Sequence, residues 1–268
     1  MIKKSALVLG LLFAAVFLRA EGIVCLGTAS LDEYPDRDRA LTEAQVNAEL
    51  QVLEVLCGYL DIPLADYSTL SDRGRVREKD GVLTARFTVK PDLWTMWQRA
   101  SDPPAMKIFI VMDSYFEGKP DLKETGFSVF LERFVNVLDI ARPELYKDAV
   151  KNVALNAERD RIIMEKARKN GVMFALFVNM AVTPESVVTD GERRSKSIIS
   201  AHLKNCVTGK TLWSTKPALR ADYLLREGSM YERSAGHICD IFYETCYEEI
   251  KRTMAESFLI EKYYEMRR

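Results

Sequence analysis

The chain has 268 residues, of which 48% are hydrophobic and 29% charged, and its formal net charge is −1. This composition is typical of a folded protein and excludes a chain that is largely disordered. The near balance of acidic and basic residues excludes the uniformly basic surface with which proteins bind nucleic acid or an anionic membrane. We therefore expect one large domain or two ordinary ones, and no nucleic-acid partner.

The first twenty residues have the pattern of a secretory signal peptide. Two lysines give it a positive start, residues 6–18 form an almost unbroken apolar run, and Ala20 stands before Glu21 as the small residue of a cleavage site. The apolar run is too short to span a bilayer comfortably, so we expect cleavage rather than anchoring. The sequence has no second apolar segment of spanning length. It therefore predicts a signal peptide over 1–20 and an exported product without a membrane span.

The first predicted unit covers residues 21–100 and is a small α+β domain. Its elements follow from apolar spacing and turn residues: a strand over 22–30, a helix over 38–59, strands over 69–76 and 82–89, and a short helix over 91–99. Asp80-Gly81 marks the turn between the two later strands. The unit ends at the connector Ser101-Asp102-Pro103-Pro104, because a Pro-Pro pair cannot continue a helix.

The second predicted unit covers residues 105–268 and is an α/β layered domain, since strands alternate with helices along it. The predicted elements are a strand over 106–112, helices over 126–138 and 154–170, a strand over 172–182, a hairpin over 195–205 and 210–214, and a helix over 232–264. The last helix is the longest of the chain. The predicted fold class is therefore α/β (α+β), with a small amino-terminal α+β domain, a layered α/β domain and a long carboxy-terminal helix.

The chain has five cysteines, Cys25, Cys57, Cys206, Cys239 and Cys246, and no CxxC pair among them. The missing CxxC argues against a zinc site and against a thioredoxin-like motif. Cys25 and Cys57, on a strand and on the helix that follows it, are the pair that we would test for a disulfide. The alternative is that the cysteines are small buried apolar residues, which is the general expectation for most of them.

No residue pattern in the sequence indicates a catalytic centre, a cofactor site or a metal site. His202 and His237 are the only histidines, and nothing in their spacing suggests convergence with acids or a cysteine. The Gly-Lys-Thr run at 209–211 lacks the first glycine of a phosphate-binding loop and reads as part of a hairpin. Neighbouring acids such as Glu158 and Asp160 are typical of a solvated helix face. We therefore predict no catalytic residue, no cofactor and no metal.

Aromatic side chains stand near the ends of both units, where they either pack within the fold or contact a partner. For Trp94 and Trp97 we expect packing at the sheet edge or the boundary between the units. For the tyrosines near the carboxy terminus both interpretations stay open, because aromatic and arginine side chains are enriched in binding hot spots. The candidate partner contacts are Tyr263, Tyr264, Arg267 and Arg268.

Two stretches of sequence carry a family resemblance. The first is GTASLDEYPDRDRALTEAQVNAEL, with a Gly-x-Ala-Ser strand end and alanines at four-residue spacing. It resembles the amino-terminal domain of the flagellar assembly protein T family, which builds the H ring around the flagellar basal body in the periplasm. The second is AERDRIIMEKARKNGVMFALFVNMAV, followed by SKSIISAHLKNCVTGKTLWS. It resembles the middle domain of that family, which is similar to the TolB amino-terminal domain and the curli-secretion lipoprotein.

The resemblance extends over about residues 22–256 and implies envelope assembly without catalysis. It predicts a periplasmic structural protein, in its most specific form a flagellar basal-body ring or collar component, with flagellar motor or ring proteins as partners and a homo-oligomer as one assembly state. One alternative is a periplasmic adaptor that docks or activates a secretion or cell-wall machine. Another is an unrecognised periplasmic hydrolase, which would depend on single acidic or histidine side chains.

Overall fold

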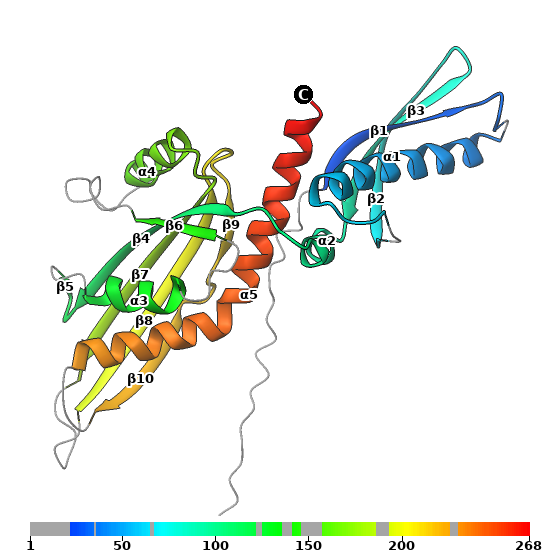
Figure 1. The fold of residues 1–268 in the computed structure, drawn as a ribbon. Helices are drawn as coiled ribbons and strands as arrows, with labels where there is room; N and C mark the ends of the chain where they lie inside the picture. The colour runs from blue at the N-terminus through cyan, green and yellow to red at the C-terminus, as the bar shows by residue number, and fades with distance from the viewer. Residues whose placement is uncertain are drawn as a thin grey trace, which may run out of the picture.

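A computed structural model describes most of the chain and has the mixed α and β composition that the sequence predicts (Figure 1). It contains two β-sheets and a long carboxy-terminal helix. The predicted signal peptide lies outside the described residues, as do residues 136–138 and 154–156 of two predicted helices. The described residues are 22–34, 36–64, 67–121, 125–135, 141–145, 157–185, 193–225 and 230–268.

The amino-terminal unit is a three-stranded antiparallel sheet with one long helix on one face (Figure 1). Its strand order is β1-β3-β2, so β1 and β2 are the edge strands. Asp80 and Gly81 both have positive φ at the β2–β3 turn, as a two-residue hairpin turn requires. The elements are β1 (Ile23–Ser30), α1 (Arg37–Leu60), β2 (Thr69–Lys79), β3 (Val82–Pro91) and α2 (Leu93–Arg99).

Helix α1 lies unusually close to strand β1. Ala40, Ala44 and Ala48 recur every four residues, so they share one face of the helix, and all three are buried against the sheet. Gly27 of β1 lies beneath them, and a Cβ atom placed on it would stand 1.8 Å from the Ala44 carbonyl oxygen. The helix begins at Asp36, whose side chain accepts a hydrogen bond from the Asp38 backbone N–H at 3.0 Å.

The second unit is built on a seven-stranded mixed sheet in the order β10-β8-β7-β4-β5, with β6 also paired to β4 and β9 also paired to β8. Strands β4 and β7 run parallel at its centre, and β8 is antiparallel to β7. The strands are β4 (Met106–Phe116), β5 (Lys119–Pro120), β6 (Ala141–Leu145), β7 (Phe174–Pro184), β8 (Arg193–Asn205), β9 (Thr211–Ser214) and β10 (Leu219–Leu225). The helices are α3 (Thr125–Val135), α4 (Ala157–Lys169) and α5 (Met230–Met266).

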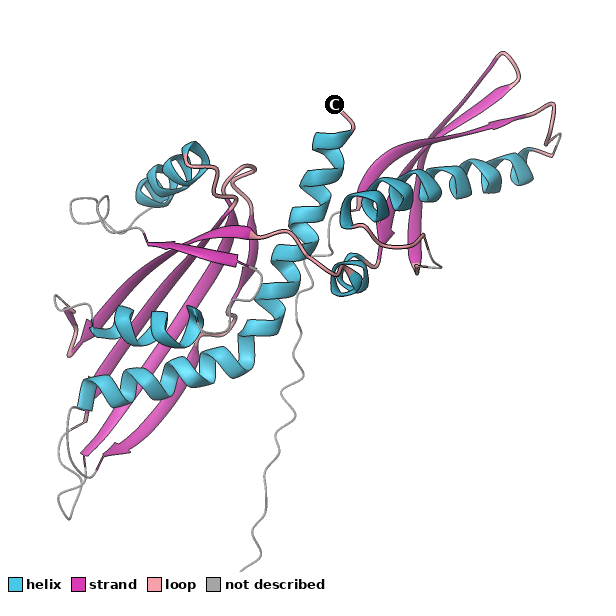
Figure 2. Cartoon of the chain, in the orientation of Figure 1, coloured by secondary structure: helices cyan, strands magenta, loops and turns pink. Residues whose placement is uncertain are grey.

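Helices cover this sheet on both faces (Figure 2). Helices α3 and α5 lie side by side over one face, while α4 lies on the other. The central strands are therefore apolar on both sides: Ile108 and Ile110 of β4 belong to the core beneath α5, and Phe109 and Val111 belong to a smaller core beneath α4. Among the described residues, no helix is long and apolar enough to cross a membrane.

Helix α5 connects the two units. Its first half lies on the seven-stranded sheet, and its second half continues to α1 and α2 (Figure 1). Phe258 of α5 packs edge-on against Trp97 of α2, with ring centroids 5.8 Å apart. At the end of the helix, the Tyr264 hydroxyl accepts a hydrogen bond from the Val24 backbone N–H at 2.9 Å, on the free edge of β1. Trp97 therefore packs at the boundary between the units, as the sequence predicts.

The structure contains three strands that the sequence analysis did not predict, namely β5, β6 and β10. Strand β10 pairs with β8 over seven residues, and β6 pairs with β4 in parallel although it contains Pro143. Both pairings lie at the margins of the sheet, where a proline and charged residues are tolerated. The other predicted helices and strands are present, with ends that shift by a few residues.

The close approach of α1 to β1 predicts opposite effects for two glycine-to-alanine substitutions. Gly27→Ala should lower the free energy of unfolding by at least about 2 kcal/mol, because the new methyl group overlaps the Ala44 carbonyl. Gly58→Ala in helix α1 should raise the free energy of unfolding by about 0.5–1 kcal/mol. No atom lies within 4 Å of the added Cβ, and alanine favours the helix over glycine. Urea unfolding measures both. Equal effects would contradict the packing described here.

Candidate functional site

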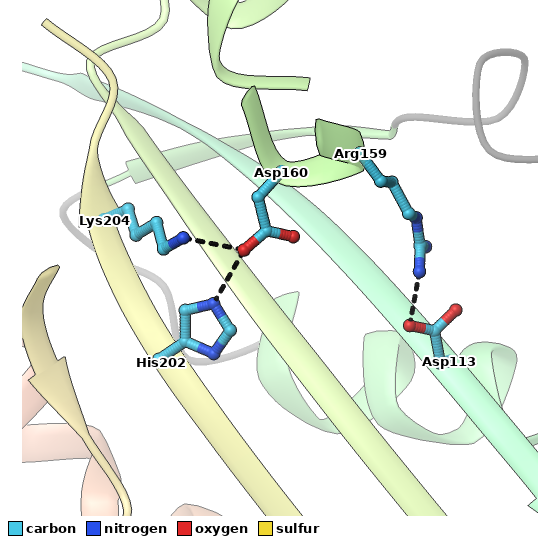
Figure 3. A network of polar contacts seen from close by, with 5 residues as sticks. All are labelled: Asp113, Arg159, Asp160, His202 and Lys204. Carbon is cyan, nitrogen blue, oxygen red and sulfur yellow. Dashed lines mark hydrogen bonds and ion pairs between the residues drawn. The ribbon is translucent and has the colours of Figure 1, made fainter. Parts of the chain in front are cut away.

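The most concentrated polar cluster of the second unit lies where the first turn of α4 meets the sheet (Figure 3). Arg159 extends from this turn to β4, where its Nη1 atom lies 2.7 Å from Asp113 Oδ2. The Arg159 side chain is 4% exposed and that of Asp113 is 24% exposed, so this ion pair is largely shielded from water. An ion pair of this kind fixes the helix against the sheet more firmly than a surface pair does.

The next residue, Asp160, turns toward β8 instead (Figure 3). Its Oδ2 atom lies 2.6 Å from Lys204 Nζ and 3.5 Å from His202 Nε2. The imidazole of His202 stacks flat on the ring of Phe177 of β7, with centroids 4.9 Å apart and an angle of 7° between the planes. Two consecutive residues of α4 thus make ion pairs with two different strands.

The electrostatics of this cluster follow from its burial. Desolvation lowers the pKa of His202, the nearby Lys204 lowers it further, and Asp160 opposes both effects. Burial raises the pKa of the Tyr115 hydroxyl, and the carboxylate of Asp113 adds to that shift. His202 is therefore a neutral imidazole at neutral pH, and the charge of Asp160 is balanced mainly by Lys204.

The ion pairs give this cluster a structural role, because they join α4 to both β4 and β8. His202 contacts Asp160 and Phe177, and its register partner on β9 is Ser214. Asp113 and Asp160 each face a cation, whereas hydrolysis needs carboxylates turned toward a substrate. The described residues also contain no group of three or more His, Cys, Asp or Glu side chains that could hold a metal.

The sequence analysis interpreted Asp160 wrongly. It placed Glu158 and Asp160 together on a solvated helix face, whereas only Glu158 is solvated and pairs with Arg161 on the surface. Asp160 is 22% exposed and faces the sheet. A signal was available in the helical spacing, because Asp160 precedes the buried Ile163 by three residues and so lies on the same side of α4.

The structure does not form the Cys25–Cys57 disulfide that the sequence suggested. Both thiols are free and buried, and Cys25 Sγ lies 3.6 Å from the carbonyl oxygen of Ala48. Cys57 stands nine residues beyond Ala48 on α1, about 13 Å along the helix axis. That separation exceeds the reach of a disulfide.

The carboxy-terminal residues divide into two groups. Tyr263 is 2% exposed, and the hydroxyl of Tyr264 bonds to β1, so both tyrosines pack within the chain rather than present their rings to a partner. Arg267 and Arg268 are exposed beyond them, and for these two a partner contact stays a prediction. His237 lies near Tyr223, with ring centroids 5.0 Å apart, far along the sheet from His202.

Comparisons with known proteins identify no family for this chain. No family model and no curated protein matches it. Among solved structures it is similar to lipoprotein GNA1162 from Neisseria meningitidis, with 13% identity, a TM-score of 0.35, and coverage of 55% of this chain and 98% of that one. The PelC dodecamer from Paraburkholderia phytofirmans has 13% identity, a TM-score of 0.33, and coverage of 65% and 95%. The LpoB C-terminal domain from Salmonella enterica has 10% identity, a TM-score of 0.29, and coverage of 50% and 93%.

Of the structures named above, one is described as a lipoprotein and one as a dodecamer. The resemblance to the flagellar assembly protein T family has no support from these comparisons and stays a prediction from the sequence.

Thiol labelling can distinguish five buried free cysteines from a chain with a disulfide. Burial raises the pKa of Cys206, Cys239 and Cys246 to about 12 and that of Cys25 to about 11, so all four stay protonated at neutral pH. We expect Ellman's reagent to label no cysteine of the folded, unreduced protein and all five in denaturant. If only three react in denaturant without a reductant, a disulfide is present and the packing of α1 on β1 is different.

The ion pair between Arg159 and Asp113 predicts a difference between two neighbouring arginines. Arg159→Ala should lower the free energy of unfolding by about 2 kcal/mol, because it leaves a partly buried carboxylate without its cation. Arg161→Ala, the matched control, removes a pair that is more than half exposed and should change it by less than about 0.5 kcal/mol. Chemical denaturation followed by circular dichroism measures both. Equal values would mean that α4 is not held to the sheet through Arg159.

Proposed function

We propose that this chain is an exported, non-enzymatic protein that works by contact with other proteins in the bacterial cell envelope. One observation carries the proposal: the polar side chains that the fold brings together form ion pairs and hydrogen bonds between its own helices and strands. Asp113, Arg159, Asp160 and Lys204 join α4 to the sheet, and Tyr264 joins α5 to β1. Such a body supports binding surfaces and contains no assembled reaction centre among its described residues.

The more specific form of the proposal is a periplasmic component of a flagellar basal-body ring or collar. The resemblance of residues 27–50, 157–182 and 195–214 to the flagellar assembly protein T family supports it. A continuous hydrophobic core that includes residues of both units supports the rigidity that a ring component needs. A periplasmic adaptor for a secretion or cell-wall machine is the competing form, and it differs in the partners that it would contact.

The neighbours of the chain in the cell decide between these forms. Crosslinking of the tagged chain in its own bacterium, followed by mass spectrometry, should recover flagellar ring or motor proteins. Secretion-channel or cell-wall enzymes in their place would establish the adaptor and contradict the flagellar form. The control is a chain that lacks residues 1–20, which should stay in the cytoplasm and lose these neighbours because the signal peptide is missing.

A contact map without any envelope protein would contradict the proposal as a whole. In that case the exported chain would act on small molecules or polymers, and an enzymatic role would need to be sought.

A further inference from the structure

The β2–β3 hairpin of the amino-terminal unit carries a concentrated basic surface. Arg73, Arg75 and Arg77 of β2 and Arg86 of β3 are all exposed. None of these four guanidinium groups forms an ion pair with an acidic residue in the described part of the chain, whereas Lys90 on the same sheet is paired with Asp72. The hairpin extends away from the rest of the molecule (Figure 1). Four unpaired like charges on one hairpin repel one another, and an acidic surface would relieve that repulsion.

A β-bulge distributes this charge around the edge of the sheet. The register between β2 and β3 shifts between Arg73 and Val76, so that Gly74 and Arg75 lie opposite Arg86. Before the bulge Arg73 pairs with the buried Phe87, and after it Arg77 pairs with Thr84 on the side away from α1. The arginines of edge strand β2 therefore occur on both faces of the sheet. Such an edge resists the addition of another strand and favours a contact made through side-chain charge.

The complementary acidic surface lies on helix α5. Asp240, Glu244 and Glu248 recur every four residues along one side of the helix, and Glu249 lies beside them; all four are exposed. Asp240 is paired with Arg133 of α3. Glu244, Glu248 and Glu249 form no ion pair with a basic residue in the described part of the chain. Arg252, one turn beyond Glu249, attracts that carboxylate without forming an ion pair with it, so the acids on this side of α5 are only partly balanced.

The two surfaces cannot meet within one molecule. The β2–β3 hairpin points away from the seven-stranded sheet, whereas Glu244, Glu248 and Glu249 lie near the middle of α5, which runs between the two units (Figure 1). We infer that the basic hairpin docks on the acidic side of α5 in a second copy of this chain, head to tail. A head-to-tail contact joins different surfaces of the two copies, so it continues into a ring or a filament.

This inference rests on the proposed function and deepens it, because it names a second copy as one of the protein partners. A second copy is favoured over another anionic surface because this chain itself carries exposed acids that complement the arginines in charge. Both sets are unpaired in the single copy, and docking balances them at once.

Charge reversal on each surface tests the contact in the purified exported chain, residues 21–268. By sedimentation velocity, the unmodified chain should associate at low ionic strength and dissociate at about 0.5 M salt, where screening is strong. Arg73→Glu/Arg75→Glu/Arg77→Glu should weaken association at least about tenfold, and Glu244→Lys/Glu248→Lys/Glu249→Lys should do the same, because each variant faces its own charge sign. An equal mixture of the two variants should associate again, since each hairpin then meets an opposite charge on the other variant.

The control reverses three exposed basic residues elsewhere, Lys119→Glu/Arg168→Glu/Lys216→Glu, and should associate as the unmodified chain does. Circular dichroism checks that each variant is folded. A chain that stays monomeric at low salt and about 0.1 mM overturns the inference, as does a mixture that fails to associate. Binding of the hairpin to phosphatidylglycerol vesicles without self-association overturns it as well. In each of these cases, cell-envelope neighbours found by crosslinking would still support the proposed function.

Discussion

The structure depends on the continuity of helix α5. Its apolar positions contact two different surfaces in turn: Phe242 and Ile250 belong to the core over the seven-stranded sheet, while Phe258 and Tyr263 pack at the amino-terminal unit. To move one unit against the other, the chain would have to break the helix or expose Phe258, and exposure of a buried aromatic side chain costs about 1.5–3 kcal/mol. The Tyr264 bond to Val24 adds a polar contact at the far end and covers part of the free edge of β1. The long carboxy-terminal helix that the sequence predicts is therefore the element that joins the two units.

Local pattern was sufficient to predict those elements that bury a regular face. Strand β7 is apolar over most of its length and α1 repeats alanine every four residues, and both were predicted within a few residues of their ends. Strand β10 escaped prediction because its sequence, LRADYLL, mixes charge with leucine, and its structure comes from pairing with β8, which no local window contains. The alanine spacing likewise predicted helix α1, but it did not predict how closely the helix packs on the sheet. That close approach depends on Gly27 of β1 as well as on the alanines of α1.

The polar cluster shows the same limit at the level of single side chains. The position of Asp160 on the buried side of α4 can be read from its spacing to Ile163, and His202 and Lys204 alternate with the buried Ala201 and Leu203 on β8. What the sequence cannot supply is the crossing of α4 over the sheet, which decides that Asp160 meets β8 while Arg159 meets β4. For the tyrosines near the carboxy terminus the sequence left packing and partner contact both open, and the hydrogen bond from Val24 of β1 to Tyr264 is a contact that no local pattern contains.

The net charge of the chain does not show how its charged residues are distributed over the surface. A balance near zero excludes a molecule that is basic all over, but it permits the separation of charge seen here, with arginines gathered on one hairpin and glutamates on one side of α5. Separation of this kind is unfavourable in an isolated molecule, because like charges repel within each surface. Contact between copies reduces this repulsion with no change in the fold. Every copy then offers its hairpin as one contact surface and the acids near the middle of α5 as the other, and the angle between these two surfaces decides whether the chain of copies closes into a ring.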